Sequence, residues 1–181
     1  MADMLDKTVL FLAIDGLDAK AFEIIWDCFG DLDASTRIAS SSADEEVCDS
    51  TSLLSTHSDM SFADAAGQNF DVIVIADGAT ANAVADSLAG KTVILRAFEQ
   101  NAALVSVGEG ALALIASDVV SGLAIAGPPS LKEPLANAGA MLSNEPLAAS
   151  ENIFSARDSQ ADLKKLCLMA SDYITSKREA A

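Results

Sequence analysis

The chain has 181 residues, of which 27 are acidic and 11 basic, so its formal net charge is −16. A surface this acidic repels the phosphates of nucleic acids and of anionic membranes, which disfavours both as partners. Hydrophobic residues make up 51% of the chain and the mean hydropathy is +0.32, values that exclude a disordered protein. The single histidine excludes any catalytic or metal site that needs two imidazoles from one chain.

The three cysteines, Cys28, Cys48 and Cys167, are scattered and form no CxxC pair. Three scattered cysteines predict no disulfide framework, and they are typical of a protein in a reducing cytoplasm. Cys28 and Cys167 fall on apolar helix faces and are interpreted as small buried hydrophobes. The first residues lack the basic region of a secretory signal, and no apolar run approaches the ~20 residues that cross a bilayer. We therefore expect a cytoplasmic protein with one domain over residues 1–181.

The first half of the chain begins with a near-continuous apolar run over residues 7–14, which predicts a strand buried on both faces. Asp18 is predicted to cap a helix that runs to about residue 29 and ends at Gly30. The segments that follow are predicted as a strand at 36–40, a loop or short edge hairpin at 40–59 and a helical turn at 62–66.

A second buried strand is predicted over residues 70–76, followed by a helix over 79–88 that ends near Gly90. Pro128, Pro129 and Pro134 predict a rigid loop. The remaining elements are predicted as strands at 92–95, 104–107 and 121–126, a buried helix at 111–117, a weak β region at 140–155 and a closing helix at 162–177.

Strands that alternate with helices predict an α/β fold, a flavodoxin-like three-layer sandwich with a mostly parallel sheet and helices on both faces. Binding sites of such sheets lie beyond the carboxyl ends of the strands. The glycines and acidic residues that end these strands are the expected ligand-binding residues: Asp15, Gly16, Asp77, Gly78, Gly108, Glu109 and Gly127. No metal site is expected.

Residues 108–113 also fit a loose dinucleotide fingerprint, but Glu109 would face pyrophosphate with the wrong charge, so no cofactor is expected.

The segment VSVGEGALAL at 105–114 resembles the strand, elbow and helix of the ThiJ/PfpI family, within the class I glutamine-amidotransferase-like superfamily. Four further segments resemble the family's other parts in the same order: LFLAIDGLDAKAFEIIWD, DMSFADA, FDVIVIADGA and NIFSARDSQADL. The resemblance covers most of the chain and implies the family's fold. It also implies a homodimer, because members of the family often form one.

The departures from this family concern its reactive residues. The family's nucleophilic cysteine falls on Gly108, and its activating acid falls on about Ala21, with Glu23 two residues away. Its common histidine falls on Glu109 or on Gly127. A glycine at the elbow supplies no side chain and relaxes the strain of a positive φ angle. Glu109 is interpreted as an ordinary acid of a helix N-terminus, with a catalytic role as the alternative.

These observations lead to two main hypotheses. The first is a catalytically silent ThiJ/PfpI-like protein, a homodimeric binding or scaffold module whose crevice is vacant or holds a small molecule. The alternative is a hydrolase- or lyase-type enzyme in which Asp15, Asp77 and Glu109 converge and act on a small carbonyl or amide substrate. A weaker third hypothesis is that the charge of −16 docks a basic partner.

Overall fold

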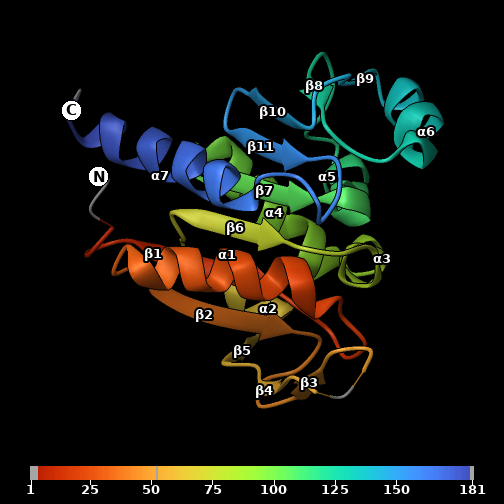
Figure 1. Ribbon diagram of the computed structural model, residues 1–181. Helices are drawn as coiled ribbons and strands as arrows, with labels where there is room; N and C mark the ends of the chain where they lie inside the picture. The colour runs from red at the N-terminus through yellow and green to blue at the C-terminus, as the bar shows by residue number, and fades with distance from the viewer. Residues whose placement is uncertain (1–3, 52, 180–181) are drawn as a thin grey trace.

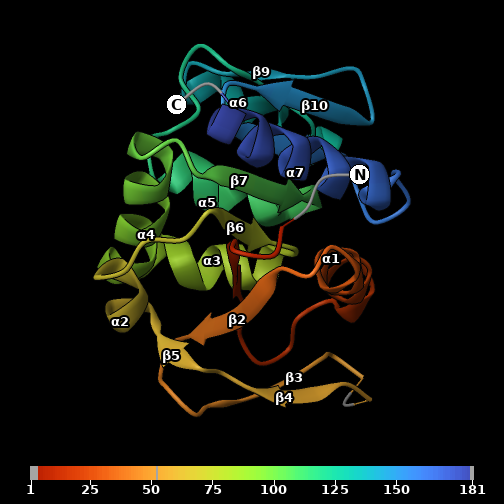
Figure 2. The same ribbon diagram turned by 90° about the vertical axis from the view of Figure 1, so that its left-hand side faces the viewer.

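The computed structural model describes residues 4–51 and 53–179, and it contains a seven-stranded sheet with helices on both faces (Figures 1 and 2). The strand order is β10-β11-β7-β6-β1-β2-β5. Neighbouring strands are parallel except β10 and β11, which are antiparallel. The expected α/β class and mostly parallel sheet are confirmed. The strands are β1 (Thr8–Leu12), β2 (Ser35–Ser40), β5 (Met60–Ser61), β6 (Val72–Ile75), β7 (Ala103–Val107), β10 (Leu147–Ser150) and β11 (Ile153–Ala156).

Two helical layers cover the sheet. One layer contains α1 (Ala19–Asp31) and α7 (Leu163–Glu179), and the other contains α2 (Phe62–Ala66), α3 (Gly78–Ala85), α4 (Leu88–Glu99), α5 (Ala111–Ala116) and α6 (Lys132–Asn137). Val9 and Phe11 of β1 pack against the first layer, whereas Leu10 and Leu12 pack against the second. Because successive side chains of a strand point to opposite faces, burial on both faces requires the continuous apolar run seen in the sequence.

The predicted cap of α1 is confirmed, since a carboxylate oxygen of Asp18 accepts a hydrogen bond from the Lys20 amide at 3.0 Å. The helix does not end at Gly30 as predicted but includes it and Asp31. The chain turns away at Leu32 and at Asp33, whose φ angle is +59°. The helix is therefore ended by backbone hydrogen bonds from Leu32 and Asp33 to the last turn, and not by Gly30 itself.

The predicted edge hairpin is formed by β3 (Glu46–Cys48) and β4 (Ser55–His57), which pair antiparallel. It lies beyond β5 at one end of the molecule (Figure 2). An isolated bridge between Leu17 and Asp49 joins it to the loop after β1. The hairpin therefore closes over the carboxyl end of the first strand.

The prediction of a strand at 92–95 is wrong, because these residues lie inside α4. Ser87 caps this helix by accepting a hydrogen bond from the Gly90 amide at 3.0 Å. A Cβ at Gly90 would lie 3.1 Å from the Cα of Val84, so a glycine allows α3 and α4 to approach closely. The predicted helix over 79–88 accordingly ends earlier, at Ala85. The α4 residues that face the core follow helical spacing: Gly90, Val93, Ile94 and Ala97.

The prediction of a rigid loop at the three prolines is also wrong. Residues 129–131 form a 3₁₀ helix, and Pro134 lies in the first turn of α6. A proline is tolerated there because amides of the first turn have no partner within the helix. The predicted strand at 121–126 is reduced to β8 (Ala124–Ile125), which pairs with β9 (Met141–Leu142).

The closing helix is confirmed as α7, and Asp162 accepts a hydrogen bond from the Lys165 amide at 3.0 Å. One of its faces packs on the sheet beside α1 (Figure 1). Across residues 4–51 and 53–179, no helix combines the length and the apolar character needed to cross a membrane.

Candidate functional site

A cleft of about 650 Å³ lies beyond the carboxyl ends of β6 and β7. We call it the strand-end cleft. Five of the seven predicted binding residues line it, namely Gly16, Asp77, Gly78, Gly108 and Glu109. The parallel order of β1, β6 and β7 explains this gathering, because the breakers after parallel strands all lie at one edge of the sheet.

The elbow after β7 is built from glycines. Gly108 has a φ angle of +57°, and it begins a 3₁₀ helix, Gly108–Gly110, that leads into α5. A Cβ at Gly108 would lie 3.8 Å from the Arg157 carbonyl oxygen, so the elbow has space for a side chain but a backbone that disfavours one. A Cβ at Gly110 would overlap the Ile75 carbonyl oxygen. Gly110 therefore permits the close approach of the elbow to the end of β6.

Asp77 lies at the start of α3 and is 8% exposed. Its carboxylate accepts hydrogen bonds from the Thr80 amide at 2.8 Å and from the Thr80 hydroxyl at 2.9 Å. Burial raises the pKa of Asp77 above its ordinary value, although the hydrogen bonds from Thr80 oppose the shift. Oδ1 thus caps the helix from within the wall of the cleft, and Oδ2 binds the Thr80 side chain.

Glu109 is only partly buried, and its Oε1 accepts a hydrogen bond from the Ser130 hydroxyl at 3.1 Å. Its side chain lies against Gly78, since a Cβ built on Gly78 would be 3.0 Å from both the Cβ and the Oε2 of Glu109. The carboxylate therefore links the elbow to the 3₁₀ helix over residues 129–131. It also covers the first turn of α3.

Asp15 and Gly127 do not line the cleft. Asp15 accepts a hydrogen bond from the Cys48 amide at 3.1 Å, which joins it to the hairpin. A Cβ at Gly127 would meet the Leu131 side chain, so this glycine packs against the 3₁₀ helix. Of the three carboxylates that the alternative hypothesis brings together, Asp77 and Glu109 line the cleft and Asp15 does not. Glu23 lies elsewhere, in a groove shared with Trp26 and Leu54.

Three residues that follow β11 were not among the predicted binding residues, although their segment is one of those that resemble the ThiJ/PfpI family. Arg157, Asp158 and Ser159 line the cleft, and the backbone of the first two lies next to Gly108 of the elbow. The Arg157 guanidinium donates a hydrogen bond to the Asn144 carbonyl oxygen, and the Asp158 carboxylate accepts one from the Gln160 amide. Among the described residues that line the cleft, Arg157 carries the one positive charge. Their position after a strand was the signal that could have identified them.

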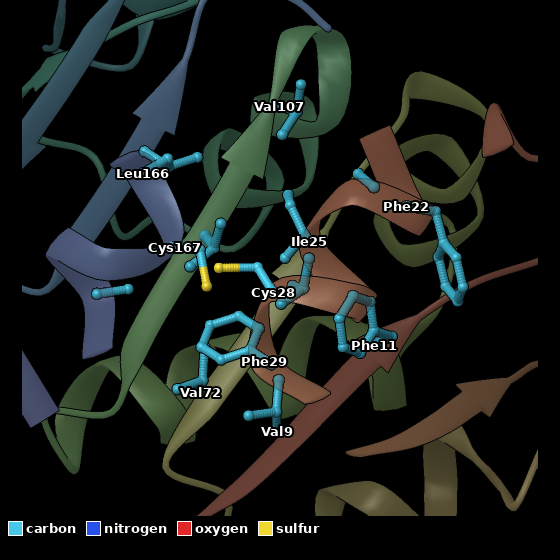
Figure 3. Packing of buried hydrophobic residues seen from close by; sticks show 14 of the residues in the cluster. Val9, Phe11, Phe22, Ile25, Cys28, Phe29, Val72, Val107, Leu166 and Cys167 are labelled. Atoms are coloured by element: carbon cyan, nitrogen blue, oxygen red, sulfur yellow. The ribbon is translucent and has the colours of Figure 1, made fainter. Parts of the chain in front are cut away.

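The cysteine sulfurs lie away from the elbow. Cys28 and Cys167 are buried in the core between α1 and α7 (Figure 3), and Cys48 lies on β3. None of the three lines the strand-end cleft. Among the described residues, no group of three or more histidine, cysteine, aspartate or glutamate side chains is placed to hold a metal ion.

Comparison with known proteins gives one family. The sequence profile of the DJ-1/PfpI family matches residues 7–170. Comparison with curated protein sequences gives no match.

Three solved structures illustrate the similarity. DJ-1beta of Drosophila melanogaster has a TM-score of 0.83 at 20% identity, over 96% of this chain and 92% of that one. A ThiJ/PfpI domain protein from Brachyspira murdochii has a TM-score of 0.83 at 14% identity, over 93% of this chain and 96% of that one. A two-domain protein from Anabaena variabilis, with DJ-1/ThiJ/PfpI-like and ferritin-like domains, has a TM-score of 0.82 at 22% identity. The match covers 96% of this chain and 48% of that protein.

Proposed function

This chain belongs to the DJ-1/PfpI family, and on that premise we propose that it is a catalytically silent member. Its role is that of a binding or scaffold module, which holds a small molecule in the strand-end cleft. The cleft volume of about 650 Å³ is typical of small-molecule sites. Its walls offer the carboxylate of Glu109, the guanidinium of Arg157 and the first turn of α3.

The observation that carries the proposal is the identity of the residue at the elbow. Gly108 occupies the left-handed turn at the end of β7, where the family resemblance places a nucleophilic cysteine. A glycine has no atom with which to attack a carbonyl. The sulfurs of the three cysteines lie elsewhere, so none of them replaces the missing thiol in this arrangement.

The alternative is an enzyme that uses carboxylates of the same cleft on a small carbonyl or amide substrate. It is favoured by the raised pKa of Asp77, because a carboxyl group that stays protonated nearer neutral pH is a better general acid. Two contacts weigh against it. Both Asp77 oxygens accept hydrogen bonds from Thr80, and Asp15 bonds to the hairpin instead of reaching the cleft.

Turnover assays separate the two functions. The purified protein is incubated with methylglyoxal and with peptide and amide substrates, beside the variants Glu109→Ala and Asp77→Asn. The proposal expects no turnover above the buffer rate for any of the three proteins. Turnover by the native chain that either substitution abolishes would overturn it in favour of the alternative.

Binding is tested by NMR with a panel of small carbonyl and amide compounds. A bound compound is expected to shift the amide signals of Gly78, Gly108 and Glu109. The signal of Gly67, which ends α2 outside the cleft, serves as the internal control. Shifts that cluster elsewhere on the protein would contradict a ligand site at the strand ends.

The homodimer implied by the family resemblance is part of the same proposal. Size-exclusion chromatography with light scattering measures it directly. The expected mass is twice the 18.6 kDa of one chain. A species of 18.6 kDa at micromolar concentration would overturn this part of the proposal and leave the cleft unaffected.

A further inference from the structure

Two of the three cysteines meet in the core on the opposite side of the sheet from α3 and α5. Cys28 lies in the last turns of α1 and Cys167 near the start of α7, and the two helices pack side by side on the sheet. Figure 3 shows their sulfur atoms pointing toward each other across the boundary between the helices. Both cysteines are free thiols. Thiols that face each other in this way are the starting arrangement for a disulfide.

The two thiols differ in their access to solvent. Cys28 is 9% exposed and lines a groove of about 540 Å³, whereas Cys167 is fully buried behind it. The groove also contains Asp31 and Lys164. It shares no lining residue with the strand-end cleft. Cys28 therefore lies at the wall of a groove that is separate from the cleft, and Cys167 lies deeper in the core.

The electrostatics of the pair divide the roles in the same way. A hydrogen bond from the Cys167 thiol lowers the pKa of Cys28 below its ordinary value, and Lys164 adds to this effect. Burial and the carboxylate of Asp31 oppose it. The same contact, together with burial, raises the pKa of Cys167. Cys28 is thus the thiol that loses its proton first, and the thiolate is the form that reacts with oxidants.

We propose that Cys28 and Cys167 form an oxidation site in which a small peroxide enters the groove, reacts with Cys28 and leaves a disulfide between α1 and α7. This function goes beyond the binding role proposed for the strand-end cleft and does not depend on it.

The reaction has two balanced steps. The Cys28 thiolate attacks one oxygen of hydrogen peroxide, the O–O bond breaks, and the released hydroxide takes a proton to form water, which leaves Cys28 as a sulfenic acid. Cys167 then loses its proton and attacks the Cys28 sulfur, the S–O bond breaks, and the departing hydroxide is protonated to a second water. Each sulfur gives up one electron, and the peroxide takes up two.

The test begins with the full-length reduced protein and hydrogen peroxide. After the peroxide is removed, the protein is denatured, free thiols are blocked with N-ethylmaleimide, and peptides are identified by mass spectrometry. The native chain is expected to fall from its three free thiols to one, with a cross-linked peptide pair containing Cys28 and Cys167. Dithiothreitol should restore all three. Alkylation of both cysteines after treatment would overturn the proposal.

Three single variants make the test specific. Cys48→Ala is the matched control and should still form the Cys28–Cys167 link. In Cys167→Ala, Cys28 should stop at the sulfenic acid, which dimedone traps. In Cys28→Ala, Cys167 should remain a thiol because it is fully buried. Circular dichroism confirms that each variant is folded before it is treated.

Two results would overturn the assignment of roles. The first is a disulfide that contains Cys48, because it would place the reaction outside the helix pair. The second is oxidation of Cys167 in Cys28→Ala at the rate of the native chain, because it would show that oxidant does not enter through Cys28.

Discussion

The side chain of Glu109 lies where a side chain at Gly78 would have to be. A Cβ at Gly78 would be 3.0 Å from the Cβ of Glu109 and equally close to its Oε2. Two turns of the site, the start of α3 after β6 and the elbow after β7, therefore fit together as a pair. The fit depends on the absence of a side chain at one residue and on its presence at the other.

This relationship predicts a coupling between the two residues. Gly78→Ala is expected to destabilise the protein by about 1 kcal/mol, because the added methyl group forces Glu109 to move. Glu109→Ala removes the contact with Oε2 but keeps the Cβ of residue 109, so in that background the cost should fall by about 0.5 kcal/mol without vanishing. Urea unfolding of the native chain, both single variants and the double variant measures the coupling. Strictly additive free energies would show that the contact does not form.

A second prediction concerns Gly110. Its Cβ would overlap the backbone carbonyl of Ile75, and backbone cannot move aside as a side chain can. Gly110→Ala should therefore lower the free energy of unfolding by about 2 kcal/mol or more. Gly67→Ala is the matched control, since a Cβ there would lie at an ordinary 3.5 Å from the Asp64 carbonyl oxygen. Its effect should stay within about 0.5 kcal/mol. Equal losses in the two variants would contradict the close approach of the elbow to β6.

A third prediction places a thiol at the elbow. Gly108→Cys should fold, because the Cβ meets nothing nearer than 3.8 Å, but the φ angle of +57° should cost about 1–2 kcal/mol. The new sulfur would open into the strand-end cleft and should be alkylated by iodoacetamide much faster than Cys167, which is fully buried. Peptide mass spectrometry after timed alkylation measures both rates. If the introduced thiol reacts as slowly as Cys167, the elbow is closed to solvent.

A fourth prediction follows from Asp77. Its pKa is raised in the folded state, so between the unfolded value of about 3.9 and that raised value the folded protein binds more protons than the unfolded chain. This group therefore contributes stability that is gained as the pH falls through the window and lost as the pH rises. Asp77→Asn keeps a side-chain oxygen for the cap but removes the titration. Its unfolding free energy, measured by urea between about pH 4 and pH 7, should improve relative to the native chain as the pH rises.

The cap itself needs a separate control for the same residue. Asp77→Ala removes the same titration and also both hydrogen bonds from Thr80, so it should be about 1 kcal/mol less stable than Asp77→Asn at every pH in that range. If Asp77→Asn and Asp77→Ala behave alike, the carboxylate oxygens do not cap α3. If the pH dependence of Asp77→Asn matches that of the native chain, the pKa of Asp77 is not raised.

Much of the fold was predictable because buried strands and helix faces require apolar residues at regular positions in the sequence. The apolar runs that became β1, β6 and β7 have no polar face, which only a strand covered on both sides allows. The run at 92–95 was misassigned for a related reason. Four apolar residues fit a strand or one turn of a helix equally well, and the choice depends on length and on neighbours. Here Ser87 and the close packing of α4 on Val84 decided in favour of the helix.

The candidate site was predictable to the extent that its residues follow recognisable strands. Asp77, Gly78, Gly108 and Glu109 come directly after well-marked apolar runs, and they line the cleft. Arg157 and its neighbours follow β11, whose run is short and lies within a weak β region, so the sequence did not mark them as a strand end. Asp15 also follows an apolar strand, but its carboxylate accepts a hydrogen bond from the hairpin and does not line the cleft.

The sequence by itself determined the buried parallel strands, the breakers that follow them and the glycine at the elbow, because each depends on residues close together in the chain. Only the tertiary structure decided that Cys28 faces Cys167, that Glu109 covers Gly78 and that Gly110 touches the backbone of Ile75. Those contacts join segments far apart in the sequence. Their formation depends on how helices and strands pack. The local pattern of apolar residues does not predict which distant side chain fills a given space.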